Sequence, residues 1–289
     1  MKSESMKGRT VLVTGATAGI GRVTAKELAN MGAKVVFIAR NEEKARVTAA
    51  WIGAETGNKD VSYLLADFAS LAQVRAAAER FSAEHGALDV LVNNAGAVFF
   101  NRQESEDGIE KTFAVNHLAP FLLTNLLLKS LRKGRKPRVV TVSSGAHVGA
   151  KLDFDDLELK QGYGSMKAYG RSKLANLLFT FELSRRLEGS GITANALHPG
   201  FVASEFAKNN GFLVRALMPL AQLAGRAVSP EEGAKTSIYL ASSPEVEGVS
   251  GKYFVKSKEA SSSEASRDTS AMIRLWEISA RMTGLPVSV

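Results

Sequence analysis

The segment Thr14-Gly-Ala-Thr-Ala-Gly-Ile-Gly21 separates an apolar run from a helical pattern. Before it, Val11-Leu-Val13 predicts a short buried strand. After it, residues 21–31 have helical spacing and end at Gly32. A glycine-rich turn between a strand and a helix lets backbone N–H groups and the positive helix end face a pyrophosphate. The segment therefore predicts a strand, a nucleotide-binding loop and a helix, in that order.

The same alternation of strand and helix continues along the chain. Further apolar strands are predicted at 34–39, 61–65, 88–92, 138–142, 192–197 and 251–255, and helical patterns lie between most of them. Because most of these strands are apolar on both faces, a parallel sheet covered on both sides is the economical architecture. We expect an α/β fold: a Rossmann-type, doubly wound parallel sheet of about seven strands with helices on both faces.

One domain is expected to span residues 1–289, since neither an internal repeat nor a second core is visible. Within it we expect an N-terminal tail at 1–8 and a C-terminal helix at 271–283. The apolar stretch 201–228 is expected to form a lid over the substrate, with contact to a membrane surface as the alternative. The serine-rich stretch 257–270 is expected to be a polar loop.

Composition excludes several classes of protein. There is no cysteine, which excludes disulfides and thiolate metal sites, and the four histidines lack metal-ligand spacing, so no metal is expected. The net charge is +8, but the basic run at 131–138 lies between an apolar helix and a strand, which favours a solvated turn over nucleic-acid binding. No segment reaches the roughly 18 apolar residues of a membrane span. We expect a cytoplasmic protein.

The end of the second strand bears on which dinucleotide binds. An acidic residue there would bind the adenosine ribose hydroxyls of NAD, but the sequence has Arg40 and Asn41. A guanidinium suits a 2′-phosphate, so NADP(H) is favoured over NAD(H). Arg22, directly after the last glycine, is either a second phosphate contact or a solvated residue at the helix start.

A candidate acid/base pair lies in Tyr169-Gly-Arg-Ser-Lys173, where a phenol and an ammonium share one face of a helix. A nearby cation can lower the pKa of a phenol and so prepare it for proton exchange. Tyr163 and Lys167 have the same spacing, but Tyr163 stands between two glycines in a poor setting for a helix. Tyr169 is therefore preferred. Ser144 is chosen from Ser143-Ser144 as the hydroxyl that binds the substrate oxygen.

Taken together, an ordered set of motifs resembles the short-chain dehydrogenase/reductase family. The set comprises the glycine loop, Asn93-Asn-Ala-Gly96, Asn116, Ser144, Tyr169 with Lys173, and His198-Pro-Gly200. The stretch 168–176 is similar to the retinol-dehydrogenase-like branch. The resemblance implies that Tyr169 is the general acid/base, that Lys173 lowers its pKa and holds the nicotinamide ribose, that Ser144 positions the carbonyl and that Asn116 supports a proton relay.

The resemblance also implies a set of cofactor-binding residues in addition to Tyr169 and Lys173. They are Gly15, Thr17, Ala18, Gly19, Ile20, Gly21, Arg40, Asn41, Asp67, Phe68, Asn93, Ala95, Gly96, Pro199, Gly200, Val202 and Ser204. Ala18 departs from the family pattern, because many NADP-using members carry a basic residue there. That departure leaves Arg40 as the main argument for NADP.

These residues predict an oxidoreductase that moves a hydride between NADP(H) and an apolar aldehyde or ketone, or the corresponding alcohol. A non-catalytic NADP(H) sensor is the alternative, although it would not need Tyr169, Lys173 and Ser144. A nucleotide-sugar epimerase also uses a Tyr–Lys pair, but it spaces its glycines differently. By analogy with related folds we expect a homo-oligomer.

Overall fold

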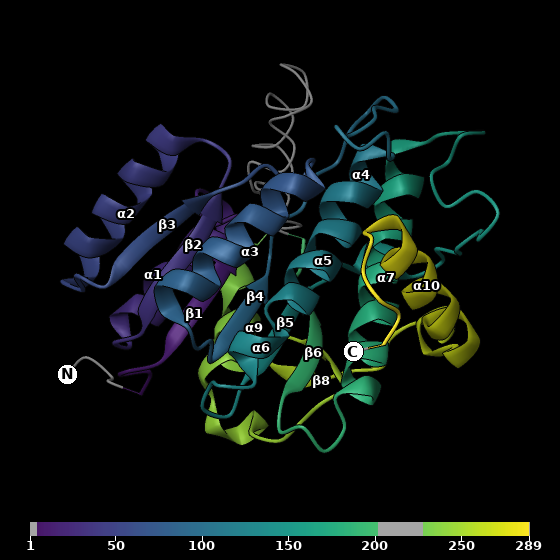
Figure 1. The fold of residues 1–289 in the computed structure, drawn as a ribbon. Helices are drawn as coiled ribbons and strands as arrows, with labels where there is room; N and C mark the ends of the chain where they lie inside the picture. The colour runs from purple at the N-terminus through teal and green to yellow at the C-terminus, as the bar shows by residue number, and fades with distance from the viewer. Residues whose placement is uncertain (1–4, 202–227, 289) are drawn as a thin grey trace.

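Seven parallel strands and one short antiparallel strand form the sheet of the computed structural model, which describes residues 5–201 and 228–288 (Figure 1). The strands are β1 (Thr10–Thr14), β2 (Lys34–Ala39), β3 (Val61–Leu65), β4 (Val90–Asn93), β5 (Arg138–Val142), β6 (Thr193–His198), β7 (Tyr253–Val255) and β8 (Lys258–Glu259). Their order is β3-β2-β1-β4-β5-β6-β7-β8, so the strand order reverses between β1 and β4. The predicted doubly wound parallel sheet is confirmed.

The eighth strand was not expected from the sequence, which predicts about seven. β8 pairs antiparallel with β7 across a turn formed by Lys256 and Ser257, both with positive φ (49° and 58°). Two left-handed residues suit a tight hairpin, but this turn lacks the Asn-Gly or Asp-Gly pair that usually reveals one. The stretch 257–270, expected as a polar loop, thus contains β8 and a 3₁₀ turn, η5 (Glu264–Arg267).

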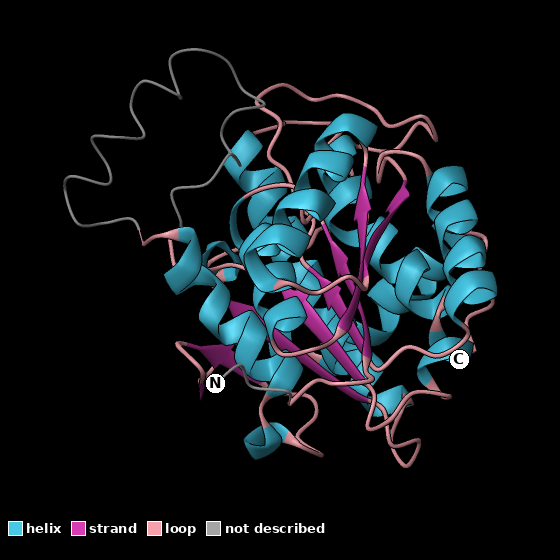
Figure 2. Cartoon of the chain, turned by 90° about the vertical axis from the view of Figure 1, so that its left-hand side faces the viewer, coloured by secondary structure: helices cyan, strands magenta, loops and turns pink. Residues whose placement is uncertain are grey.

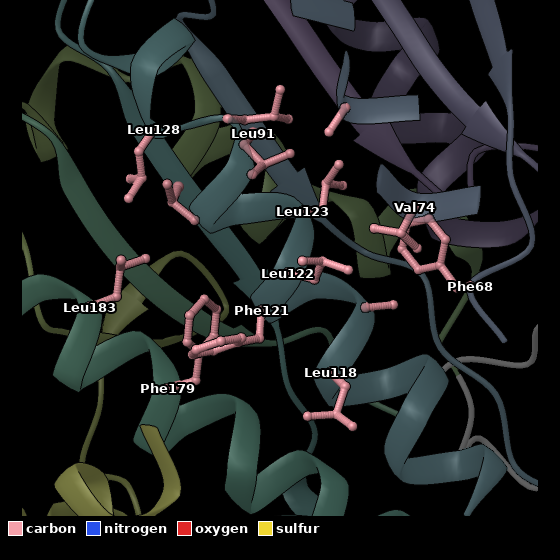
Figure 3. Close-up of a cluster of buried hydrophobic side chains, with 14 of the residues drawn as sticks. Phe68, Val74, Leu91, Leu118, Phe121, Leu122, Leu123, Leu128, Phe179 and Leu183 are labelled. Atoms are coloured by element: carbon pink, nitrogen blue, oxygen red, sulfur yellow. The ribbon is translucent and has the colours of Figure 1, made fainter. Parts of the chain in front are cut away.

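Helices cover both faces of the sheet (Figure 2). One face is covered by α1 (Gly19–Asn30), α2 (Glu42–Thr56) and α9 (Pro230–Ser242), and the other by α3 (Leu71–His85), α5 (Ala119–Leu126) and α7 (Ser165–Arg186). Each face has its own apolar cluster, and Figure 3 shows Phe121 and Phe179 in the larger one. The shorter elements are α4 (Lys111–Phe113), the π-helical η1 (Ala114–Leu118), α6 (Leu128–Leu131), η2 (Gly145–His147) and η4 (Pro244–Val246).

The C-terminal helix α10 (Thr269–Met282) packs against α7. It begins at Asp268, whose carboxylate accepts hydrogen bonds from the amides of Ser270 and Ala271. The buried ring of Trp276 lies 4.9 Å from that of Phe121 and 6.0 Å from that of Phe179, measured between centroids. The helix therefore completes the larger apolar cluster.

The structure describes part of the expected N-terminal tail at 1–8 and only the two ends of the expected lid at 201–228. Met6, which the sequence places in an N-terminal tail, is fully buried, and its amide donates to the carbonyl of Met31. Of the stretch 201–228, expected as a lid, residues 202–227 lie outside the described residues. Phe201 and Val228 flank that gap, and the Val228 amide donates to the Phe201 carbonyl at 2.8 Å.

His117 connects α10 to η1 inside the larger cluster. Its Nε2 lies 2.8 Å from the Ser279 hydroxyl, and its ring packs against Phe113, Phe121 and Phe179. Burial disfavours the imidazolium and lowers the pKa of His117 to about 3, from an ordinary value of 6.5. Between about pH 3 and pH 6.5 the ring is therefore neutral in the folded protein but protonated in the unfolded chain.

We expect acid to destabilise the protein through His117. The pKa is lower in the folded state, so the stabilisation is complete above pH 6.5 and is lost as the pH falls from 6.5 towards 3, at about 1.4 kcal/mol per pH unit for one proton. In His117→Gln this side chain cannot titrate, but its amide can still form a hydrogen bond with the Ser279 hydroxyl. Urea unfolding at pH 7.5 and pH 4.5 should show a smaller loss in the variant, and equal losses would contradict the assignment.

Candidate active site

Four loops meet at one edge of the sheet, because β1, β4, β5 and β6 are adjacent and parallel. The carboxyl ends of these strands lead into the glycine loop, the Asn93–Gly96 segment, Ser144 and the Pro199-Gly200 pair. This edge lies beside the reversal of strand order, where open α/β sheets bind their ligands. The topology therefore brings most of the candidate residues to one place.

Glycines are required in the loop after β1. A Cβ on Gly15, whose φ is +68°, would lie 2.9 Å from the Ala95 Cα, and a Cβ on Gly21 would lie 2.4 Å from the Gly15 carbonyl oxygen. The loop leads into α1, whose N-cap position is Ala18. Among the described residues no side chain caps that helix end. Its first amides are thus available to an anion, which fits the pyrophosphate of a dinucleotide.

Asn94 ties the glycine loop to β4, and sequence reasoning left it out of the candidate site. Its Nδ2 donates to the carbonyls of Thr14 (2.8 Å) and Gly15 (3.2 Å). The neighbouring Asn93, expected to line the cofactor, is buried and donates to the Thr124 hydroxyl at 2.9 Å. β4 ends at Asn93, so Asn94 is the first residue of the loop, and an asparagine that begins a loop was the signal that could have identified it.

Asn116 lies in the π-helical turn η1 and is fully buried. Its Oδ1 accepts from the Ala97 amide (2.7 Å), and its Nδ2 donates to the Ala97 carbonyl (2.9 Å) and to the Ser172 hydroxyl (3.0 Å). A Cβ placed on Gly96 would lie 3.3 Å from the Lys173 Nζ and 3.4 Å from the Asn116 Oδ1. The structure thus brings Asn116, Gly96 and Lys173 together.

Tyr169 and Lys173 lie one turn apart on α7, with the Lys173 Nζ 5.6 Å from the centre of the Tyr169 ring. The Nζ donates to the Val142 carbonyl at 3.0 Å. Ser144 makes a side-chain hydrogen bond with Tyr169. Ser143, the other candidate hydroxyl, is buried and donates to the Lys173 carbonyl at 2.8 Å. Of the two serines, Ser144 is therefore the one beside the phenol.

Tyr163 and Lys167, the alternative pair with the same spacing, do not lie beside Ser144. Tyr163 lies before α7 begins, and its hydroxyl donates to the Phe99 carbonyl at 2.7 Å. Lys167 is exposed. The glycines around Tyr163 keep it out of the helix, as the sequence indicated.

Burial controls the acidity of the pair. It raises the pKa of Tyr169 to about 12, although the hydrogen bond with Ser144 acts in the opposite direction. It also lowers the pKa of Lys173 to about 8. The sequence had predicted that the ammonium lowers the pKa of the phenol. In the structure desolvation of both groups is the larger effect, and the Nζ is directed at the Val142 carbonyl.

The residues expected at the adenosine end have mixed placements. Arg40 is exposed at the end of β2. Asn41 caps α2, since its Oδ1 accepts from the Lys44 amide at 2.9 Å. The Asp67 carboxylate accepts from the Ala69 amide at 2.9 Å. Phe68 is buried in the apolar cluster near Val74 (Figure 3), so any contact it makes with a nucleotide would involve its backbone.

Three further placements complete the candidate set. The Arg22 guanidinium lies over the ring of Trp51, 4.7 Å from its centroid. Pro199 and Gly200 are half-buried after β6, and Gly200 has a φ of +88°. Val202 and Ser204 lie outside the described residues.

Within residues 5–201 and 228–288, no helix combines the length and apolarity needed to cross a bilayer. Nor do three or more potential metal-ligating side chains gather there.

Gly170 lets α7 approach the turn that carries Ser144. A Cβ at this position would lie 2.8 Å from the Ala146 carbonyl oxygen in η2. The helix and the turn are therefore in contact through backbone atoms. This close approach brings Ser144 within reach of Tyr169.

Comparison with known proteins gives a consistent set of relatives. A family model described as short chain dehydrogenase matches residues 9–211. Retinol dehydrogenase 14 of Homo sapiens is 45% identical over 295 residues, covering 97% of this chain and 88% of its own length. Retinol dehydrogenase 13 of Homo sapiens is 43% identical, covering 97% and 86% respectively.

Solved structures of similar proteins have the same fold as this chain. An uncharacterized protein from Mycobacterium paratuberculosis has a TM-score of 0.79 and 33% identity, covering 98% of this chain and 96% of that chain. A Pseudomonas aeruginosa RhlG/NADP complex has a TM-score of 0.70 and 29% identity, covering 88% and 96%.

We expect Gly170→Ala to destabilise the fold by about 1–3 kcal/mol, because its new methyl group would overlap the Ala146 carbonyl. The matched control is Gly53→Ala within α2, where a Cβ would make an ordinary contact at 3.5 Å with the Asn58 carbonyl oxygen. The control should be neutral or stabilising, since alanine favours helix. Urea unfolding compares them, and equal stability of the two variants would refute the predicted overlap.

Proposed function

The chain belongs to the short-chain dehydrogenase/reductase family and is an oxidoreductase, and we propose that it transfers a hydride between NADP(H) and an apolar carbonyl or alcohol. The resemblance seen in the sequence, including the retinol-dehydrogenase-like branch, is confirmed. The observation that carries the proposal is the gathering of Ser144, Tyr169 and Lys173 at the carboxyl edge of the sheet.

In the proposed reaction each side chain has one task. The Ser144 hydroxyl binds the carbonyl oxygen, and the Tyr169 phenol donates its proton to that oxygen as the alcohol forms. Bound NADPH supplies the hydride to the carbonyl carbon. A phenol with a pKa of about 12 is protonated at neutral pH, so it carries the proton that reduction of a carbonyl requires. The Lys173 ammonium and the uncapped end of α1 present positive charge to the cofactor.

The proposed preference for NADP(H) depends on Arg40. This side chain is exposed at the end of β2, where an acidic residue would instead suit the ribose of NAD. Two similar proteins were solved with NADP, RhlG and a short chain dehydrogenase from Burkholderia cenocepacia. Arg22 is the weaker candidate for the 2′-phosphate, because its guanidinium already stacks on Trp51.

The substrate is proposed by class. Several similar proteins are named retinol dehydrogenases, which supports a lipophilic aldehyde, ketone or alcohol without selecting a retinoid. A cytoplasmic location and self-association also remain proposals. Cell fractionation and light scattering test them.

A non-catalytic NADP(H) sensor is the second candidate, and the intact set of Asn116, Ser144, Tyr169 and Lys173 argues against it. A panel of lipophilic carbonyls and alcohols, offered with each dinucleotide, decides between the two. Cofactor consumption would support the enzyme. Tight NADPH binding without consumption of any substrate would support the sensor.

Tyr169→Phe should lower turnover by about 10²- to 10⁴-fold, because the variant has no proton to donate. NADPH binding, followed by nucleotide fluorescence, should be retained. Tyr163→Phe is the matched control. It removes a phenol that bonds to the Phe99 carbonyl outside the proposed site, and it should keep turnover near the wild-type level. Undiminished turnover in Tyr169→Phe would refute the assignment.

Arg40→Leu should raise the KM for NADPH about tenfold or more and leave that for NADH little changed, because only NADPH carries the 2′-phosphate. Arg46→Leu serves as the control, since Arg46 is a nearby exposed arginine paired with Glu43. Steady-state kinetics with both nucleotides measure the effect. A parallel rise for NADH and NADPH would argue against 2′-phosphate recognition by Arg40.

A further inference from the structure

Two imidazoles hold the single peptide group that joins Ser144 to Gly145. The Nδ1 of His147 lies 2.7 Å from the Ser144 carbonyl oxygen. The Gly145 amide donates to the Nδ1 of His198 at 3.0 Å. One ring therefore bonds the C=O of this peptide and the other bonds its N–H. The rings come from different elements, η2 and the end of β6.

The hydrogen bonds define the tautomer of each ring. The Nε2 of His147 accepts from the Ser263 amide at 3.1 Å, so the proton of the neutral ring is on Nδ1 and is donated to Ser144. The Nδ1 of His198 accepts from Gly145, so its proton is on Nε2. His147 is only 2% exposed and packs edge-on against Tyr253, with the ring centres 5.3 Å apart. Neither ring can protonate without losing an acceptor that the structure uses.

The orientation of this peptide group bears on the Ser144 hydroxyl. The ψ torsion of Ser144, 156°, relates its Cβ to the plane of the peptide that follows. A plane held at both its oxygen and its nitrogen therefore restricts where the side chain points. The Ser144 Oγ accepts from the Ala146 amide at 3.2 Å, and its hydrogen bond with Tyr169 lowers the pKa of that phenol, so the hydroxyl proton is directed at the tyrosine oxygen.

We propose that His147 and His198 are positioning residues that clamp the Ser144–Gly145 peptide and thereby aim the Ser144 hydroxyl at the substrate oxygen. The inference rests on the proposed function, since it needs Ser144 to bind that oxygen. It also gives a role to His147 and His198, to which the sequence analysis assigned no task in the reaction. Ser263 extends the clamp to the segment after β8.

Burial lowers the pKa of both His147 and His198, although the hydrogen bond with the Ser144 carbonyl acts in the opposite direction on His147. Charge on His147 lowers the pKa of His198 further. They are therefore neutral at neutral pH, as the clamp requires. Tyr253 of β7 packs against the His147 ring, and α7, the helix packed on η2, carries the titratable groups Tyr169 and Lys173. As the pH falls below these lowered pKa values, protonated His198 can no longer accept from Gly145, and the clamp opens.

Substitution of His198 tests the clamp through kcat. An asparagine Oδ1 can stand where Nδ1 stands, so His198→Asn keeps the acceptor, whereas His198→Leu removes it. We expect kcat to fall about tenfold or more in the leucine variant and by less than about threefold in the asparagine variant. NADPH affinity should be unchanged in both. His85→Asn, a largely buried histidine at the end of α3, is the control and should leave kcat unchanged.

A double-mutant cycle separates positioning from general damage to the fold. In a Ser144→Ala background the His198→Leu substitution should cause no further loss, because there is no hydroxyl left to aim. An equal loss in that background would overturn the proposal. The acid limb of the kcat profile should also become less steep in His198→Asn, since one of the two titrating rings is gone.

A measurement that does not depend on enzymatic turnover distinguishes failure of the positioning inference from failure of the proposed function. In ¹⁵N NMR spectra near neutral pH, His147 should be in the Nδ1–H form and His198 in the Nε2–H form, with peaks assigned from the variants. An Nδ1–H tautomer at His198 would overturn the clamp. If the wild-type protein consumes no NADPH with any carbonyl, the proposed function fails. If it does and the asparagine and leucine variants behave alike, only the positioning inference fails.

Discussion

The hydrogen bond from the buried Lys173 ammonium to the Val142 carbonyl is the contact around which the site is arranged. Burying a lysine is costly, so its charged form persists only where a backbone oxygen accepts from it. Val142 is the last residue of β5, and this bond therefore fixes α7 to the carboxyl edge of the sheet. Tyr169, one turn earlier, is carried to the same edge. Gly170 allows the contact, because any larger residue would push the Ser144 turn away.

The parts of the fold that the sequence predicted share a strong local signal. Buried parallel strands are apolar on both faces, which is why the sheet and the strand-loop-helix at 14–21 could be predicted. β8 was missed because two residues in a polar hairpin leave no pattern. α9 is different, since Ser229 followed by Pro230 and Glu232 is a start signal that was present and not used. Segment 202–227 gives no clear strand or helix pattern, and sequence reasoning ends there.

The sequence could distinguish between two candidate site residues where their neighbours along the chain differed. Tyr169 could be preferred to Tyr163 because glycines flank only the latter. Asn93 and Asn94 differ in their partners, since Asn93 bonds Thr124 in α5 and Asn94 bonds the carbonyl of Thr14 at the end of β1, and that depends on where β4 ends. Asn116 is buried in a π-helical turn, and a run of helical spacing does not reveal such a turn. The sequence thus identified which residues belong to the site, and the structure showed which groups their side chains contact.

The pKa values of the titratable groups in the site are shifted mainly by burial rather than by a single neighbouring charge. Desolvation raises the pKa of Tyr169 and lowers those of Lys173, His147 and His198, so it favours the neutral form of each group. A neutral phenol is a proton donor, and a neutral imidazole can both donate and accept. The same burial that makes an isolated charge costly thus further favours the protonated phenol and the neutral imidazoles on which the peptide clamp depends. Proton donation and the aim of the Ser144 hydroxyl therefore depend on one physical condition, the burial that disfavours charge on these side chains.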